Sequence, residues 1–124
     1  MGNEEKDKVK RIAFLVTIAP GDTARLETML GYALAAAAIG YEMMMFFALD
    51  SALVAKQQVF DKMEPKVRER IRESIKEGIE MNICSASAQT FGIKESDLIE
   101  GAKIGGIASF YFYAEDADIV LTWN

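Results

Sequence analysis

Two uninterrupted apolar runs limit what this chain can fold into. The segments KRIAFLVTI (Lys10–Ile18) and YEMMMFFAL (Tyr41–Leu49) lack the alternation of polar and apolar residues that marks a strand with one solvated face. Such runs are typical of parallel strands that helices cover on both faces. Between them, apolar residues recur at three- and four-residue spacing from Thr23, which predicts a helix capped by Asp22 or Thr23. Strand, helix and strand in this order indicate a parallel sheet.

The rest of the chain continues this alternation. Further helices are predicted over residues 52–63, 65–77, 85–91, 95–101 and 103–117, and further strands over residues 79–84 and 118–123. Within this scheme Gly105 and Gly106 precede a helix rather than follow a strand, and serve close helix packing. The predicted fold class is α/β: a three-layer α/β/α sandwich with a mostly parallel sheet of about 4–5 strands, flavodoxin-like or Rossmann-like.

Length and charge narrow the function classes. The chain of 124 residues fits a single domain over 1–124, in which residues 1–9 are too charged to bury and are expected to fray. Its net charge of -5 argues against nucleic acid or an anionic membrane as a partner. The apolar stretch Tyr32–Leu49 contains Gly40 and Glu42, so a helix, a turn and a strand are predicted there instead of a membrane span.

The sequence lacks the residues that several kinds of functional site require. The sequence contains neither GxGxxG nor GxxxxGK[ST], and in IAPGDT Pro20 removes a backbone donor while Asp22 would repel a phosphate, which disfavours a flavin loop. The chain has no histidine, so a Ser/His/Asp or Cys/His pair within it is excluded and the commonest transition-metal ligand is missing. We therefore predict no metal and no organic cofactor.

The remaining candidate is Cys84, the only cysteine, at the point where a predicted strand passes into a helix. One cysteine cannot form an internal disulfide, and no signal segment opens the chain, so a cytoplasmic location is expected. A helix N-terminus beside the thiol favours the thiolate, which attacks electrophilic sulfur. Ser85 and Ser87 are supporting residues that either hydrogen-bond to the sulfur or cap the helix, and capping is the preferred role. The alternative is that Cys84 is a small core residue.

The segment CSASAQTFGIKESDLIEGAKIGGIASFYFYAEDADIVLTW resembles the DsrE/DsrF/TusD superfamily of sulfur-relay proteins, especially the stand-alone DsrE-like branch that is labelled peroxiredoxin. The match runs through Cys84, FGI, DLIEG, IGG and ADIVLTW, and the N-terminal half agrees more loosely. The resemblance implies a domain that assembles into trimers or hexamers and carries sulfur as a cysteine persulfide, with Cys84 as the catalytic position. TusD-type members have Arg-Arg-Gly after the cysteine, whereas this chain has Thr90-Phe91-Gly92 and lacks that positive charge.

Three functional hypotheses follow. The first is a sulfur carrier or sulfurtransferase in which Cys84 exchanges sulfur with donor and acceptor proteins of TusA-like or rhodanese-like type. The second is a non-catalytic oligomeric binding subunit in which Cys84 only packs, and the third is a weak thiol peroxidase. A homo-oligomer is expected in each, because the aromatic run at residues 110–113 points in successive directions around a helix and one sheet face cannot cover all of it.

Overall fold

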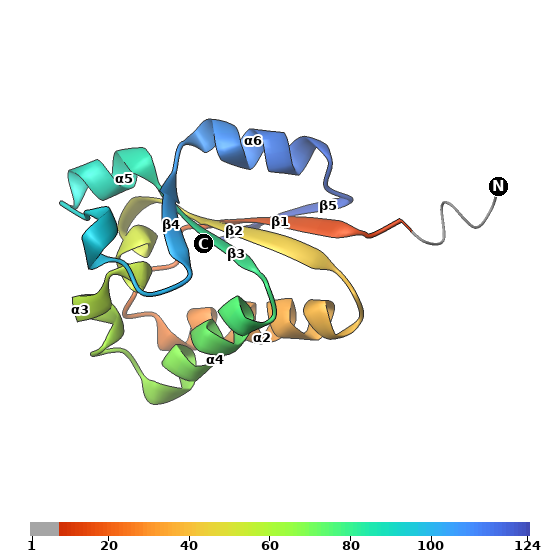
Figure 1. Ribbon diagram of the computed structural model, residues 1–124. Helices are drawn as coiled ribbons and strands as arrows, with labels where there is room; N and C mark the ends of the chain where they lie inside the picture. Colours follow the sequence, from red (N-terminus) through yellow and green to blue (C-terminus); the bar gives the residue numbers. More distant parts are fainter. Residues whose placement is uncertain (1–7) are drawn as a thin grey trace.

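A five-stranded parallel sheet forms the centre of the molecule (Figure 1). The structure is a computed structural model that describes residues 8–124, so most of the segment expected to fray lies outside the described residues. The strand order is β4-β3-β2-β1-β5. The strands are β1 (Arg11–Val16), β2 (Glu42–Phe47), β3 (Glu80–Cys84), β4 (Ala102–Gly105) and β5 (Ile119–Trp123). The predicted α/β class and parallel sheet are confirmed.

Helices lie on both faces of the sheet. In Figure 1, α2 and α4 lie below it, α6 lies above it, and α5 follows the end of β3. Their bounds are Thr23–Ala38 for α2, Pro65–Lys76 for α4, Ser85–Thr90 for α5 and Ile107–Glu115 for α6. Asp22 caps α2 as expected, since its carboxylate accepts a hydrogen bond from the Arg25 backbone N–H at 3.2 Å. Within residues 8–124, none of the helices combines the length and apolar character needed to cross a bilayer.

The two faces of the sheet bury separate apolar clusters, which explains the continuous apolar runs. Along β2, Met43, Met45 and Phe47 belong to the larger cluster with α2 and α4. The intervening Met44 and Phe46 belong to a smaller cluster beneath α6. Neither face of β2 is left to solvent, so its sequence shows no polar alternation.

The helix predicted over residues 103–117 is wrong at its start. Ala102–Gly105 instead form strand β4 at the edge of the sheet, and α6 begins only at Ile107. Gly105 therefore ends a strand, contrary to the prediction, and Gly106 is an extended N-cap with φ −77° and ψ 163°. Two adjacent glycines are costly inside a helix, whereas pairing with β3 satisfies the backbone groups of this segment.

The helix predicted over residues 52–63 is also interrupted. It consists of a 3₁₀ helix η1 (Leu49–Ala55) and a short α3 (Gln57–Phe60), separated at Lys56. Lys56 is extended and forms an antiparallel bridge with Leu98, so a long-range contact breaks the local helix. The helical turn predicted over 95–101 is limited to the 3₁₀ helix η2 (Glu95–Asp97).

Gly101, just before β4, is expected to tolerate no side chain. Its φ of +92° is in the left-handed region, and a Cβ there would collide with the Ile75 side chain. We expect Gly101→Ala to lower the free energy of unfolding by roughly 2–5 kcal/mol, from about 1–2 of backbone strain and about 1–3 of overpacking. Urea denaturation measures the loss.

Gly78→Ala is the matched control, because Gly78 has φ +87° but open space where its Cβ would lie. It should lose only the backbone part, about 1–2 kcal/mol. Equal losses in the two variants would contradict the predicted collision with Ile75.

Candidate functional site

Cys84 lies at the carboxyl edge of the sheet, as predicted. It is the last residue of β3 and the N-cap of the six-residue helix α5, and it is in register with Gly105 of β4. Its side chain packs against the smaller apolar cluster beneath α6, which includes Phe46 and Phe110 with ring centroids 5.7 Å apart. The residue is half-buried. Cys84 therefore has apolar contacts on one side and is partly accessible as a residue.

The turn between β4 and α6 passes close to this strand end without presenting a side chain. A Cβ on Gly106 would be 3.8 Å from the hydroxyl oxygen of Ser85, and a Cβ on Gly105 would be 3.0 Å from that of Ser109. Ser109 in turn donates a hydrogen bond of 2.6 Å to the Gly106 carbonyl. The tight contact is therefore the one between Gly105 and Ser109 of α6, whereas a side chain at Gly106 would meet Ser85 only at an ordinary contact distance.

The capping role preferred for the two serines is wrong. Among residues 8–124 no side chain caps α5, and Ser87 is buried with its hydroxyl accepting a hydrogen bond of 2.7 Å from the Leu49 backbone N–H. Leu49 has φ +57°, a left-handed conformation that is unusual for a leucine, and its side chain is exposed. Ser87 therefore holds the loop after β2 against α5.

Tyr113 of α6 is a titratable group near this face, and its pKa is strongly shifted. The pKa of its hydroxyl is raised to about 12, chiefly by burial; Arg11 opposes this rise, and the carboxylates of Glu80 and Glu42 add smaller upward contributions. Tyr113 packs against the same apolar cluster as Cys84. The neutral phenol is therefore the form that the folded protein favours.

A pH-dependent loss of stability follows. Below about pH 10 the tyrosine is neutral in both states, but between pH 10 and about 12 the unfolded chain ionises first, so stability falls as pH rises. Tyr113→Phe should flatten this fall by less than about 1.4 kcal/mol per pH unit, because the ring is partly exposed and its interactions are screened. Urea denaturation from pH 8 to pH 11 tests this, with Tyr111→Phe at an exposed ring as the control. Parallel curves for wild type and Tyr113→Phe would contradict it.

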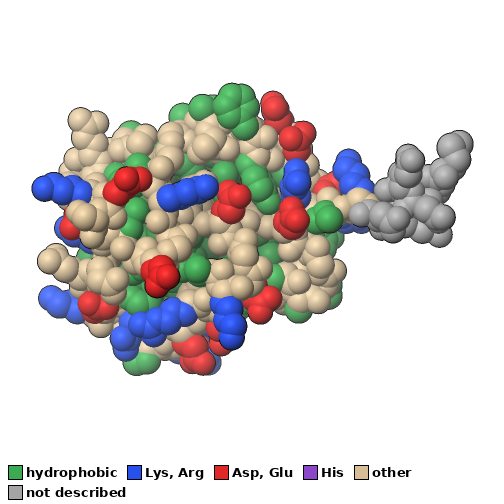
Figure 2. All heavy atoms as spheres, viewed as in Figure 1, with side chains coloured by type: hydrophobic (Ala, Val, Ile, Leu, Met, Phe, Trp, Pro, Cys, Tyr) green, Lys and Arg blue, Asp and Glu red, His purple; other side chains and the backbone are tan. Residues whose placement is uncertain are grey.

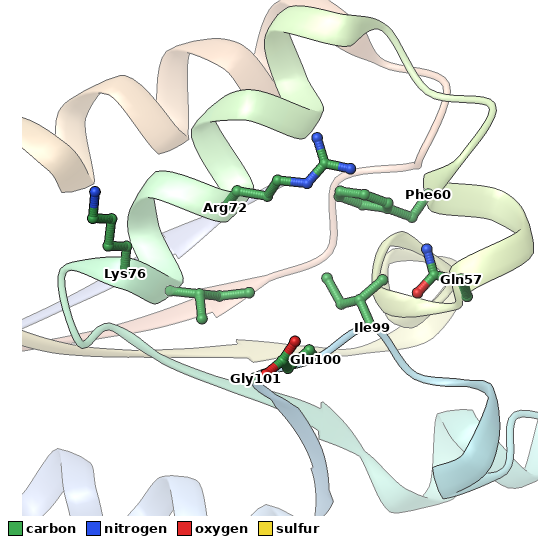
Figure 3. Close-up of a pocket in the computed structure, with 8 residues that line it drawn as sticks. Gln57, Phe60, Arg72, Lys76, Ile99, Glu100 and Gly101 are labelled. Atoms are coloured by element: carbon green, nitrogen blue, oxygen red, sulfur yellow. The ribbon is translucent and has the colours of Figure 1, made fainter.

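One cavity lies away from Cys84, between α3, α4 and the segment before β4 (Figure 3). Its volume is about 480 Å³. Arg72 crosses it with its guanidinium carbon 5.0 Å from the centre of the Phe60 ring, and Lys76 lies one helical turn further on. Cys84 is not among its lining residues, so this cavity is no part of the predicted site.

A second cavity, of about 500 Å³, lies on the same face of the sheet as Cys84, between α6 and strands β3 and β4. Asn82 lines it, two residues before the cysteine on β3. Sequence reasoning did not single out Asn82, which is the amide side chain of the strand EMNIC. Gly105, the register partner of Cys84, also lines this cavity.

Comparisons with known proteins agree with this fold. The model of the DsrE/DsrF-like family matches residues 10–123. An uncharacterized protein of Methanocaldococcus jannaschii is 28% identical over 113 residues, which cover 91% of this chain and 99% of that protein. The crystal structure of the ychN protein from E. coli superposes with a TM-score of 0.80 at 19% identity, over 93% of this chain and 100% of that chain.

A protein of unknown function from Methanobacterium thermoautotrophicum has a TM-score of 0.73 at 15% identity, over 90% of this chain and 98% of that one. At these identities the structural likeness concerns the fold alone. The family model, by contrast, matches nearly the whole sequence, over residues 10–123. The chain therefore belongs to the DsrE/DsrF-like family.

Proposed function

We propose that this protein is a sulfur carrier of the sulfurtransferase type, in which Cys84 holds sulfur as a persulfide. The observation that carries the proposal is a single, half-buried cysteine at the carboxyl edge of a parallel sheet and opposite a glycine. Membership of the DsrE/DsrF-like family supports a role of sulfur-relay type at the level of the family. Sulfur exchange needs only a reachable thiolate and a sulfur that can leave.

The proposed reaction is two displacements at sulfur. The Cys84 thiolate attacks the terminal sulfur of a donor persulfide, the S–S bond of the donor breaks, and the donor leaves as a thiolate. An acceptor thiolate then attacks the outer sulfur of the Cys84 persulfide and Cys84 leaves as a thiolate. No net oxidation or reduction occurs. Since the chain has one cysteine, the sulfur cannot be displaced by an internal disulfide and has to pass to another molecule.

We infer donor and acceptor proteins of TusA-like or rhodanese-like type, acting in the reducing cytoplasm. Docking at the carboxyl edge would bring an acceptor thiol to Cys84 without moving the sheet. Two neighbours of this edge suit a docking surface, since the Leu49 side chain is exposed and the turn at Gly105 and Gly106 presents backbone only. A role as a binding subunit without transfer is the alternative, and the packing of Cys84 against an apolar cluster favours it.

We further propose a homo-oligomer, a trimer or a hexamer. Large apolar side chains are exposed on α6, where Phe112 is 67% and Tyr111 is 63% accessible, and along the edge strand β5. Figure 2 shows hydrophobic side chains at the top of the molecule, over α6, while acidic and basic side chains are interspersed across the rest of that view. Apolar surface of this kind on a sheet edge favours burial against another copy.

The test of the carrier proposal is whether the native protein gains a sulfur atom that a reductant removes, and whether the gain depends on Cys84. Intact-protein mass spectrometry measures both.

A further inference from the structure

Asn82 is a buried amide whose oxygen lacks a hydrogen-bond partner within an apolar strand. The residue is 2% exposed, and its side-chain oxygen is shielded from solvent and accepts no hydrogen bond from the described residues. An unpaired buried polar group is costly, and an apolar residue of similar size at the same position would avoid the cost. Because such groups are rare in folded proteins, the missing partner calls for a physical explanation.

The side chain of Asn82 leans along the sheet toward Cys84. Residues two apart on a strand share one face, so both residues lie on the face of β3 that α6 covers. The Cγ atom of Asn82 lies 4.0 Å from the point that a Cβ on Gly105 would occupy, and Gly105 is the register partner of Cys84. The register partner of Asn82 itself is Lys103, two residues earlier on β4. The amide therefore reaches forward to the level of the cysteine.

The distance and the chemistry both allow the amide to meet the sulfur. The bases of side chains two residues apart on a strand are separated by roughly 6–7 Å, since each residue advances about 3.3 Å. The leaning amide covers part of this distance, and Gly105 contributes no side chain to the space beside it. A half-turn about the last side-chain bond of Asn82 exchanges its oxygen and its NH₂ group, so the unpaired position can hold a donor. A thiolate is the matching acceptor, because hydrogen bonds to a charged group are roughly twice as strong as those between neutral groups.

We propose that the Asn82 side-chain amide donates a hydrogen bond to the Cys84 sulfur when this sulfur is a thiolate, and thereby stabilises the form that attacks electrophilic sulfur. A neutral thiol bonds only weakly, so the amide gains its partner when the cysteine ionises. This inference rests on the proposed function, because the thiolate is the form that exchanges sulfur.

The test compares the pH dependence of alkylation by iodoacetamide in wild type and Asn82→Leu. Loss of one hydrogen bond to a charged group should move the profile of the variant to higher pH by about one unit or more. The variant should unfold at no lower urea concentration than wild type, because leucine removes an unpaired buried amide. Ser74→Ala is the matched control, since it replaces another buried polar side chain, on α4 at the opposite face of the sheet, and should leave the profile unchanged. Superimposable profiles for wild type and Asn82→Leu would overturn the proposal.

A second measurement leaves Asn82 in place. In NMR spectra of the wild type, the side-chain NH₂ resonances of Asn82, assigned by their loss in Asn82→Leu, should shift over the pH range in which alkylation accelerates. The shift should be absent in Cys84→Ser, which has no thiol to ionise. Resonances that move equally in both proteins would make the amide a structural group and overturn the proposal. Failure of the wild type to gain sulfur from polysulfide would instead refute the carrier proposal and would leave both of these results standing.

Discussion

Wild-type protein incubated with inorganic polysulfide is expected to gain about one sulfur atom per chain, and Cys84→Ser is expected to gain none. The reason is that Cys84 is the only thiol in the chain and belongs to a half-buried residue at the end of β3. The added sulfur should be lost on treatment with a reductant, because a persulfide is an S–S bond open to thiol exchange. Intact mass spectrometry before and after reduction measures both steps.

Two controls make this result decisive. A known persulfide carrier loaded in parallel shows that the conditions supply sulfur, and a rhodanese with thiosulfate provides a protein donor in place of polysulfide. Alkylation of the native protein with iodoacetamide reports directly on access to the Cys84 thiol. If the wild type gains nothing while the known carrier loads, or if Cys84 reacts only after denaturation, the carrier proposal is wrong and the binding-subunit alternative stands.

The elements that the sequence predicted well are those whose local pattern and long-range packing agree. Strands β1 and β2 are covered on both faces, so their apolar runs are unbroken, and α4 has its buried Val67 and Ile71 one turn apart. Strand β4 was missed because it has four residues at an edge and its Lys103 is exposed. No local pattern separates such a segment from the start of a helix, and only the pairing of Asn82 with Lys103 and of Cys84 with Gly105 decides it.

The position of Cys84 could be predicted for a similar reason, because the end of an apolar strand followed by small residues is visible in the sequence. The roles of the residues around Cys84 could not be predicted from the sequence. Ser87 stands in the first turn of α5, where serine is often a cap, yet its hydroxyl pairs with the Leu49 N–H, 38 residues earlier in the chain. Asn82 is likewise a single polar residue in the sequence, and only the structure shows that it lines the cavity beneath α6.

Val120→Lys in strand β5 is expected to convert the proposed trimer or hexamer into a monomer. Strand β5 pairs only with β1, so one edge of its backbone is free within the described residues, and Val120 is 51% exposed between two other partly exposed residues, Ile119 and Leu121. In a monomer a lysine at this position stays in water and blocks edge-to-edge association. In an oligomer that buries β5, it would place a charge in an apolar interface at a cost of several kcal/mol.

Multi-angle light scattering at micromolar concentration measures the change as a threefold or sixfold fall in mass, and circular dichroism checks that the variant is folded. Phe91→Lys is the matched control, because it introduces the same charge at an exposed apolar residue next to α5, an element that contacts β3 and β4 rather than β5. It should leave the mass of the oligomer unchanged. A monomeric wild type would contradict assembly itself. An unchanged mass for Val120→Lys would instead move the interface away from β5 and leave the exposed aromatic residues of α6 as the surface through which the copies meet.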